Sequence, residues 1–332
     1  MLRAGVIGGG AMGRNHMRVL RDLDDLVELV GVAEPSEMAR AALRKAGTTL
    51  YARPEHLLEQ ERPDLVIVAV PTAEHAPVGL VALRYGCHVL IEKPIASTEQ
   101  EGRALIDEAA RQGCLLAVGH IERHNPAIVE LKRRLEAAEL GHVFEAHVRR
   151  IGPFPTRIRD VGVVLDLATH DIDVLRYLLD GEVERVYAET ERRIHTDHED
   201  LLSALLRFTG GTVAALDINW LTPTKVRKLS VTGERGMFTV NYLTQELTFY
   251  ENDATDITWT ALRTIKGVSE GNMTRLKIQR QEPLYVELMD FVTAIRDGRS
   301  PLVRGEDGLA ALRIAQTIVR SGKEHAVLPV EV

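Results

Sequence analysis

The feature that most restricts the fold is a glycine-rich turn that directly follows the first apolar run of the chain. The run is Leu2–Ile7, and Gly8, Gly10 and Gly13 after it have the spacing G-x-G-x-x-G. In a strand–turn–helix unit these glycines allow a tight turn, a close approach of the backbone to a pyrophosphate, and close packing of helix on strand. The sequence therefore predicts a dinucleotide site, and the alternative is a glycine-rich turn that binds nothing.

Short apolar runs and helical patterns alternate over the first domain, which we expect to span residues 1–121. The expected strands are Leu2–Ile7, Val27–Ala33, Leu65–Val70, His88–Ile91 and Leu115–Gly119, and the expected helices are Met12–Arg21, Ser36–Ala46, Ala76–Tyr85 and Thr98–Arg111. Thr98 and Glu101 have the spacing of a capping box at the start of the last helix. This alternation predicts a parallel sheet with helices on both faces, as in a Rossmann domain.

The pattern changes in the second expected domain, residues 122–332, where strand-like runs follow a single strong helix. The helix is Val163–Leu179, the strands are Glu184–Arg193, Leu201–Phe208, Thr212–Trp220, Lys225–Thr232 and Met237–Tyr242, and two closing helices are Pro283–Arg296 and Glu306–Ser321. Gly210-Gly211 predicts a two-residue hairpin, and the polar segment 252–275 predicts a long loop or an edge hairpin. The expected fold class is α/β, with a Rossmann domain and a second α/β domain built on a large, mainly antiparallel open sheet. The last helices are candidates to pack back on the first domain.

A carboxylate at the end of the second expected strand bears on the choice of cofactor. Glu34 stands there, where a dinucleotide-binding domain holds the ribose hydroxyls, and its charge would repel a 2′-phosphate. We therefore expect NAD rather than NADP, although Arg40 nearby keeps NADP open and Glu34 could instead be a solvated loop acid. The first residues of the helix after the glycine turn, Ala11 and Met12, are expected to offer N–H groups to the cofactor.

Polar residues also follow two further strands. Glu92 and Lys93 end one strand, and Pro71, Thr72 and His75 follow the strand before it. Ligands of an open parallel sheet bind outside the carboxyl ends of the strands, so all five are expected to face the cofactor. Glu92 and Lys93 could alternatively be a surface ion pair. A tight turn would also suit a cis peptide bond at Lys93–Pro94.

Several motifs in this order resemble the Gfo/Idh/MocA oxidoreductase family. They are the glycine motif, VPTAEH at 70–75, EKPIA at 92–96, ERHNPA at 122–127 and LDLATHDIDVLRYL at 165–178. His124 departs from the phenylalanine that is usual in this family. The resemblance covers nearly the whole chain and implies a dehydrogenase of sugars or inositols. It also implies a homodimer or homotetramer formed through the second sheet.

The helix after residue 163 carries Asp166 and His170, four residues apart and therefore on one face. A lone histidine in such a helix could simply be buried and hydrogen-bonded for packing. The family resemblance implies instead that Lys93, Asp166 and His170 form the catalytic set. In that interpretation His170 takes the hydroxyl proton and Lys93 stabilises the developing negative charge on oxygen. Asp166 orients the hydroxyl or the imidazole. How the base role divides between His170 and Lys93 stays open.

Basic residues ahead of this helix suggest the substrate. Arg149, Arg150, Arg157 and Arg159 form a cluster that could bind a diphosphate or could be a solvated basic segment. The surrounding sequence resembles the branch of the family that oxidises C3 of UDP-N-acetylglucosamine. We expect this nucleotide sugar as substrate, with Arg157 and Arg159 on the diphosphate. A free sugar or myo-inositol is the alternative.

Two further residues, Arg123 and Asn125 of the ERHNPA motif, are expected to contact the substrate. The histidines His195 and His198, with acidic residues close by, could bind a metal, but two histidines in a polar turn are more often exposed, and no metal is expected. A protein that binds NAD without chemistry, such as a redox sensor, would not need the three catalytic residues together. We therefore expect an enzyme.

Overall charge and composition exclude other classes of protein. The net charge is −7, which argues against nucleic acid as a partner because phosphate backbones require a basic surface. No apolar run approaches the roughly 18 residues of a membrane span. The first strand begins at Leu2, which leaves no room for a signal peptide, and Cys87 and Cys114 are expected as free thiols. These features predict a cytoplasmic protein.

Overall fold

The computed structural model describes residues 1–44, 47–155, 161–179, 181–194, 197–254 and 268–331. The chain divides into two compact units. The first contains residues 1–124 and 282–313, and the second contains residues 125–281 and 314–332. The chain therefore leaves the first unit after His124 and returns to it at Glu282.

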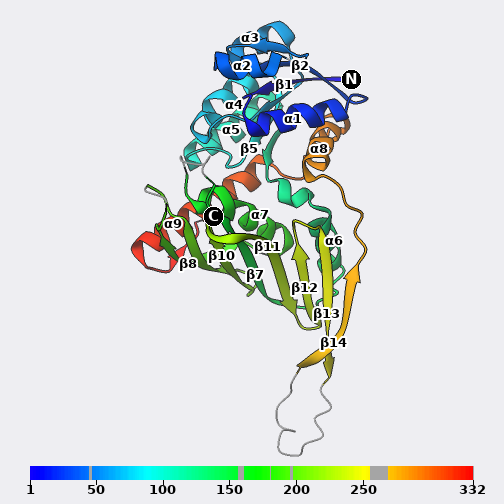
Figure 1. Ribbon diagram of the computed structural model, residues 1–332, viewed down its shortest axis with the longest axis vertical. Coiled ribbons are helices and arrows are strands. Elements are labelled where there is room, and N and C mark those ends of the chain that lie inside the picture. Colours follow the sequence, from blue (N-terminus) through cyan, green and yellow to red (C-terminus); the bar gives the residue numbers. More distant parts are fainter. Residues whose placement is uncertain (45–46, 156–160, 180, 195–196, 255–267, 332) are drawn as a thin grey trace, which may run out of the picture. The chain divides into compact units, whose positions relative to one another are not determined.

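The first unit is built on a parallel sheet, as the alternating pattern predicts (Figure 1). Its described strands are β1 (Leu2–Ile7), β2 (Val27–Ala33), β3 (Thr49–Tyr51), β4 (Leu65–Val68), β5 (His88–Glu92) and β6 (Leu116–Gly119). They lie in the order β3-β2-β1-β4-β5-β6, the order of a doubly wound dinucleotide fold. The Rossmann prediction is confirmed.

Helices cover this sheet, and one of them comes from late in the sequence. They are α1 (Ala11–Asp22), α2 (Glu37–Leu43), α3 (Pro54–Glu61), α4 (His75–Arg84), α5 (Glu99–Gln112) and α8 (Pro283–Asp297), with short 3-10 turns at Thr72–Glu74 and Ile121–His124. Leu288 and Phe291 of α8 join the buried cluster that contains Met17 and Leu20 of α1. The expected return of a closing helix to the first unit is thus made by α8.

Two helix starts follow the capping rules read from the sequence. Ser36 accepts a hydrogen bond from the Ala39 N–H at 3.3 Å. Thr98 accepts one from the Glu101 N–H at 3.2 Å, and Glu101 accepts one from the Thr98 N–H at 3.0 Å. The predicted capping box is therefore formed. By contrast, β3 and α3 were not predicted, because both are short and their apolar periodicity is weak.

The second unit is built on a mainly antiparallel sheet, as predicted. Its described strands are β7 (Val143–Pro153), β8 (Val183–Glu191), β9 (Leu201–Phe208), β10 (Val213–Asn219), β11 (Leu221–Gly233), β12 (Gly236–Asn241), β13 (Glu246–Ala254), β14 (Val268–Leu276) and β15 (Leu328–Pro329). The order is β14-β13-β12-β11-β7-β10-β9-β8-β15, and β7 pairs with β10 in parallel. β13 and the edge strand β14 pair antiparallel, and they contain both ends of the segment 252–275 that was expected as a loop or edge hairpin.

The helices of the second unit leave one sheet face open. They are α6 (Pro126–Glu136), a π-helical turn η4 (Val164–Ala168), α7 (Thr169–Leu178) and the later part of α9 (Gly305–Glu324). Along β9, Leu202, Ala204 and Leu206 are buried, whereas Ser203 and Leu205 between them are exposed. This alternation is typical of a sheet with one covered and one exposed face.

The turn between β9 and β10 differs from the prediction. The Phe208 N–H donates to the Thr212 carbonyl and the Gly211 N–H donates to the Phe208 carbonyl, both at 2.9 Å. Residues 209–211 therefore form a three-residue turn rather than a two-residue one. Gly211 has a φ of 92°, the left-handed position that such turns require.

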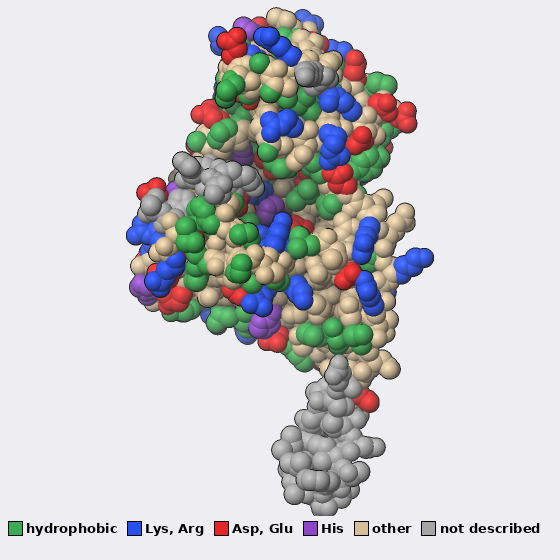
Figure 2. Space-filling view, viewed as in Figure 1, with side chains coloured by type: hydrophobic (Ala, Val, Ile, Leu, Met, Phe, Trp, Pro, Cys, Tyr) green, Lys and Arg blue, Asp and Glu red, His purple; other side chains and the backbone are tan. Residues whose placement is uncertain are grey.

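The surface of the described residues carries charges of both signs. Figure 2 shows lysine and arginine side chains mixed with acidic and hydrophobic ones on the visible face of each unit. Within the described parts of the chain, no helix is both long enough and apolar enough to cross a membrane. Cys87 and Cys114 are free thiols, and burial raises the pKa of Cys87 to about 12.

Candidate active site

The glycine turn has the geometry of a dinucleotide site. Gly8 has a φ of 104°, and a Cβ there would lie 2.2 Å from the Ala69 carbonyl oxygen. A Cβ on Gly13 would lie 1.8 Å from the Gly8 carbonyl oxygen, so helix α1 packs against the turn only with glycine. At Gly10, however, an added Cβ would meet no protein atom within 4 Å. The fold itself therefore requires Gly8 and Gly13, whereas Gly10 leaves open space for a ligand to approach the backbone.

The start of α1 adds anion-binding groups beside this open space. Gly10 is the N-cap of α1 and provides no side chain to cap the helix. Ala11 and Met12 are the first helical residues and are exposed. The first N–H groups of a helix have no partner within the helix, and they attract a phosphate.

Glu34 is held in place by the backbone of two turns. Its Oε2 accepts a hydrogen bond from the Gly9 N–H, and its Oε1 accepts one from the Ser36 N–H, both at 2.8 Å. Arg40 donates to the carbonyl oxygens of Glu34 and Pro35, so its guanidinium is tied to this turn. The carboxylate is thus fixed at the end of β2, where remaining lone pairs can accept from ribose hydroxyls.

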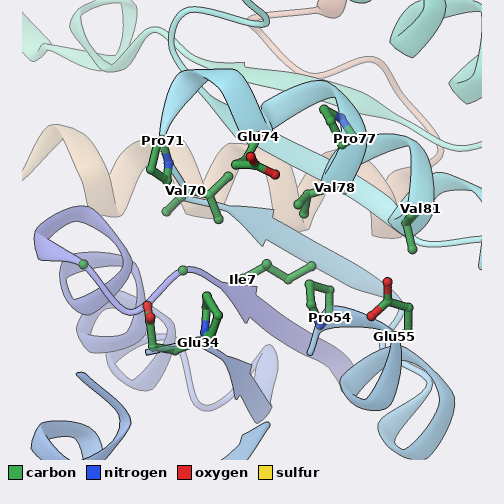
Figure 3. Close-up of a pocket in the computed structure, with 14 residues that line it drawn as sticks. Ile7, Glu34, Pro54, Glu55, Val70, Pro71, Glu74, Pro77, Val78 and Val81 are labelled. Atoms are coloured by element: carbon green, nitrogen blue, oxygen red, sulfur yellow. The ribbon is translucent and has the colours of Figure 1, made fainter. Parts of the chain in front are cut away.

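A cavity of about 860 Å³ lies at the carboxyl ends of β1, β2 and β4 (Figure 3). Its lining comprises Ile7, Gly8, Gly10, Glu34, Pro35, Pro54, Glu55, Ala69, Val70, Pro71, Glu74, Pro77, Val78 and Val81. Figure 3 shows Glu34 on one wall and Glu74 on the opposite wall, from the turn before α4. Apolar walls with a few fixed polar groups are typical of a cofactor site.

Several lining residues were not predicted from the sequence. Glu74, Val78 and Val81 recur at helical spacing at the start of α4 and along it, and this spacing could have identified a cavity-facing side of the helix. Glu55 lies in the first turn of helix α3, which was not predicted from the sequence. The carboxylates of Glu34, Glu55 and Glu74 make the cavity acidic, which disfavours an extra phosphate on the cofactor.

Glu92 and His75, both expected to contact the cofactor, bind the protein's own groups. Glu92 Oε1 lies 2.7 Å from His16 Nε2, and the His16 side chain is completely buried. Burial alone would raise the pKa of Glu92, but the hydrogen bond with His16 and the nearby charges outweigh it and lower the pKa. His75 is 1% exposed, and its ring nitrogens lie 2.7 Å from the Pro94 carbonyl and 3.0 Å from the Val70 carbonyl. A direct role of either side chain on the cofactor remains a prediction.

Lys93 directly follows β5 and is half-buried, and the Lys93–Pro94 peptide bond is cis as predicted. Thr72 begins the 3-10 turn after β4, and Pro71 before it lines the cavity. The turns after β4 and β5 are neighbours because the two strands pair in parallel. The sequence motifs VPTAEH and EKPIA therefore meet at one edge of the sheet.

Asp166 and His170 lie at an irregular point of a helix in the second unit. Asp166 is inside the π-helical turn η4, and His170 is the second residue of α7. Both are half-buried, whereas Asp171 and Asp173 on the same helix are buried. A π-turn inside a helix is frequent at functional sites because it displaces the side chains of the preceding turn.

Two models of one family match two consecutive segments of this chain. Residues 2–120 match an oxidoreductase family with an NAD-binding Rossmann fold, and residues 128–239 match the Gfo/Idh/MocA C-terminal domain. The chain belongs to the Gfo/Idh/MocA oxidoreductase family. The predicted family is confirmed, and with it an NAD-dependent dehydrogenase of the type that acts on sugars and inositols.

Relatives of known activity within this family differ in substrate. The chain is 29% identical to the UDP-N-acetylglucosamine 3-dehydrogenase of Acidithiobacillus ferrooxidans, with 94% of each chain covered. A solved structure of that enzyme matches with a TM-score of 0.84 and covers 97% of this chain and 98% of its own. The chain is also 28% identical to inositol 2-dehydrogenase 2 of Saccharopolyspora erythraea, over 100% of this chain and 96% of that protein. Identity alone therefore does not separate the two substrate classes.

Only two of the four arginines expected as a cluster are described, and the side chains of these two do not lie together. Arg149 and Arg150 are neighbours on β7 and point to opposite faces of the sheet, because side chains alternate along a strand. Arg149 is exposed and lies 3.2 Å from Asp217. Arg150 is buried and binds Asp171 through two hydrogen bonds. Arg157 and Arg159 lie outside the described residues.

The two expected substrate contacts of the ERHNPA motif are buried. Arg123 is 5% exposed and lies 3.3 Å from Asp307 in the first unit. Asn125 is the N-cap of α6, accepting from the Ala127 N–H at 3.2 Å, and its Nδ2 donates to the Tyr242 carbonyl at 3.2 Å. Both side chains thus contact groups of the protein itself, and contact with substrate remains a prediction.

The candidate metal ligands around residue 195 are only partly described. Buried Asp200 accepts hydrogen bonds from the N–H groups of Arg193 and Ile194, so it shapes this turn. His195 lies outside the described residues. Within the residues that are described, no three ligating side chains are grouped to hold a metal ion.

Proposed function

We propose that this protein oxidises a secondary hydroxyl of a sugar, namely C3 of UDP-N-acetylglucosamine, to a ketone with NAD. The observation that carries the substrate is the similarity to the UDP-N-acetylglucosamine 3-dehydrogenase of Acidithiobacillus ferrooxidans over 94% of both chains. The polar residues at the carboxyl ends of β4 and β5, next to the cofactor cavity, support a catalytic rather than a sensing role.

The roles of the chain's own residues follow from their chemistry. A bound NAD, held at the glycine turn and Glu34, would supply the acceptor for the hydride of the carbinol carbon. His170 takes the hydroxyl proton, because an imidazole titrates near neutral pH. Lys93 stabilises the negative charge that develops on the oxygen, and Asp166 orients the hydroxyl or the imidazole. Lys93 belongs to the first unit, and Asp166 and His170 belong to the second.

The test is NADH formation, followed by absorbance, with NAD and four substrates in parallel: UDP-N-acetylglucosamine, N-acetylglucosamine, glucose and myo-inositol. A ketone trap keeps an unfavourable equilibrium from hiding turnover. We expect turnover with the nucleotide sugar, and a loss of about 10²-fold or more in kcat for Lys93→Ala, the usual range for a lost acid–base or electrostatic group. Exposed Lys323 on α9 provides the matched control, and Lys323→Ala should leave kcat unchanged.

Each outcome of this comparison of substrates tests one part of the proposal. Turnover of N-acetylglucosamine, glucose or myo-inositol in place of the nucleotide sugar would keep the dehydrogenase and reject the nucleotide substrate. The inositol dehydrogenase, at 28% identity, makes myo-inositol the second candidate. NADH binding without any turnover, unaffected by Lys93→Ala, would support a sensor.

The exposed sheet face suggests an assembly of identical chains. Leu205 is 50% exposed on β9, and Ala215 on β10 lies opposite it in the sheet. We propose that this face pairs with a second copy, giving a dimer or tetramer. Light scattering should report a multiple of the 36.9 kDa chain, and Leu205→Glu should lower the mass. A measured mass of a single chain for the native protein would reject this assembly.

A further inference from the structure

His75 is placed between the two turns that end β4 and β5. It is the first residue of α4 and is 1% exposed. Its Nδ1 lies 2.7 Å from the carbonyl oxygen of Pro94, directly after Lys93. Its Nε2 lies 3.0 Å from the carbonyl oxygen of Val70, which lines the cofactor cavity. The buried imidazole therefore lies between the turn that carries Lys93 and the turn that faces the cofactor, in contact with a carbonyl of each.

This arrangement is different from that of a cofactor ligand. Both ring nitrogens contact main-chain carbonyls, and His75 is not among the residues that line the cavity. Burial lowers the pKa of His75. The two carbonyl contacts and the charge of Glu92 offset this lowering only in part, and the charge of Lys93 lowers the pKa further. A neutral imidazole has one N–H and donates to only one of the two carbonyls, so the ring would hold the other turn by packing alone.

We propose that His75 is a positioning residue of the reaction, which fixes the Lys93–Pro94 turn against the Val70–Pro71 turn and so places the Lys93 amine beside the bound nicotinamide. The inference rests on the proposed function, because it requires that Lys93 acts in catalysis. A displacement of about 1 Å in a reacting group can cost on the order of 10²-fold in rate. A fixed turn holds the backbone of Lys93 in place and so limits how far its long, flexible side chain can shift.

The test compares three variants of the full-length protein. His75→Leu removes both ring contacts, and His75→Gln keeps an N–H group that can reach one carbonyl. His88→Leu is the matched control, because His88 begins the same strand β5 and its Nδ1 accepts from the Leu115 N–H at 2.9 Å, at the opposite end from Lys93. For each, kcat and KM are measured with the sugar that is turned over, and NADH affinity is measured by fluorescence.

We expect His75→Leu to lower kcat by roughly 10- to 100-fold while the Kd for NADH changes less than about threefold. His75→Gln should recover part of kcat, and His88→Leu should keep it. Equal losses in NADH affinity and kcat would overturn the proposal and make His75 a cofactor ligand or a general structural residue. Unchanged kcat in His75→Leu would overturn it as well.

A second measurement does not depend on turnover. Hydrogen–deuterium exchange of residues 92–97 should become faster in His75→Leu, and less so in His75→Gln, but should stay unchanged in His88→Leu. If no sugar is turned over, the proposed function fails, and unchanged exchange in this segment would then separately reject the positioning role. If His75→Leu does not fold, the comparison of His75→Gln with the native protein decides by the same two readouts.

Discussion

Arg150 of the second unit and Glu287 of the first are both buried residues with ionisable side chains, yet their surroundings differ. Arg150 donates from Nε and Nη2 to the two carboxylate oxygens of Asp171, at 2.5 and 3.0 Å, and its guanidinium lies 5.1 Å from the Tyr242 ring centre. Glu287 of α8 is 3% exposed, and neither carboxyl oxygen has a hydrogen-bond partner among the described residues. A buried charge is tolerated when it is paired, whereas an unpaired acid becomes neutral instead.

The pKa of Glu287 reflects this difference. Burial raises it well above the ordinary value, and the negative charges of Glu92 and Asp290 raise it further. Glu92 keeps its charge because it accepts a hydrogen bond from His16. The first unit therefore holds two acids whose pKa values shift in opposite directions, that of Glu92 downward and that of Glu287 upward.

The largest effect is expected from breaking the paired case. Asp171→Ala leaves the Arg150 guanidinium buried without its carboxylate, which should lower the free energy of unfolding by about 3–5 kcal/mol. Urea denaturation followed by circular dichroism measures this change. A loss below about 1 kcal/mol would show that the pair does not stabilise the second unit.

A smaller, pH-dependent effect is expected for the unpaired acid. The raised pKa means that Glu287 contributes its full stability below its unfolded pKa, and that this contribution is lost as pH rises toward the folded pKa. Relative to Glu287→Gln, the native protein should therefore lose at most ~1.4 kcal/mol of unfolding free energy per pH unit in that range. Melting curves from pH 4.5 to pH 9 should converge at the acid end and favour the glutamine variant at the alkaline end.

Exposed Glu306 at the start of α9 serves as the control for this comparison. Glu306→Gln should follow the native pH dependence between pH 6 and pH 9. Parallel curves for the native protein and Glu287→Gln across the whole range would show that Glu287 is ionised in the folded state.

The smallest effect is expected at the exposed counterpart of the buried pair. Arg149 precedes Arg150 on β7, and its partner Asp217 is about half exposed. Because water screens such a pair, Asp217→Ala should change the free energy of unfolding by less than about 1 kcal/mol. Urea denaturation, as for Asp171→Ala, measures this change and so compares the two adjacent arginines. Similar losses of unfolding free energy in both variants would mean that burial is not what distinguishes the two ion pairs.

The first unit was the more predictable of the two. Strands β1 and β2 have the bounds expected from their apolar runs, and the capping box of α5 was read from Thr98 and Glu101. In the second unit β7, the strand in the middle of the sheet, was not expected, because the charged Arg150 stands at a buried position of its alternation. The helix with Asp166 and His170 was predicted, but its π-helical turn was not.

The sequence by itself determined the glycine turn, the strand ends with Glu34 and Lys93, and the family, because each depends on residues close together in the chain. Only the tertiary structure decided what the buried polar residues bind. The partners of His75, Glu92 and Arg150 lie between 5 and 76 residues away, and the strand pleat and helix packing select them. Burial then affects their charge. Because a buried group has lost its water, it stays ionised only where a hydrogen-bond partner stabilises the charged form.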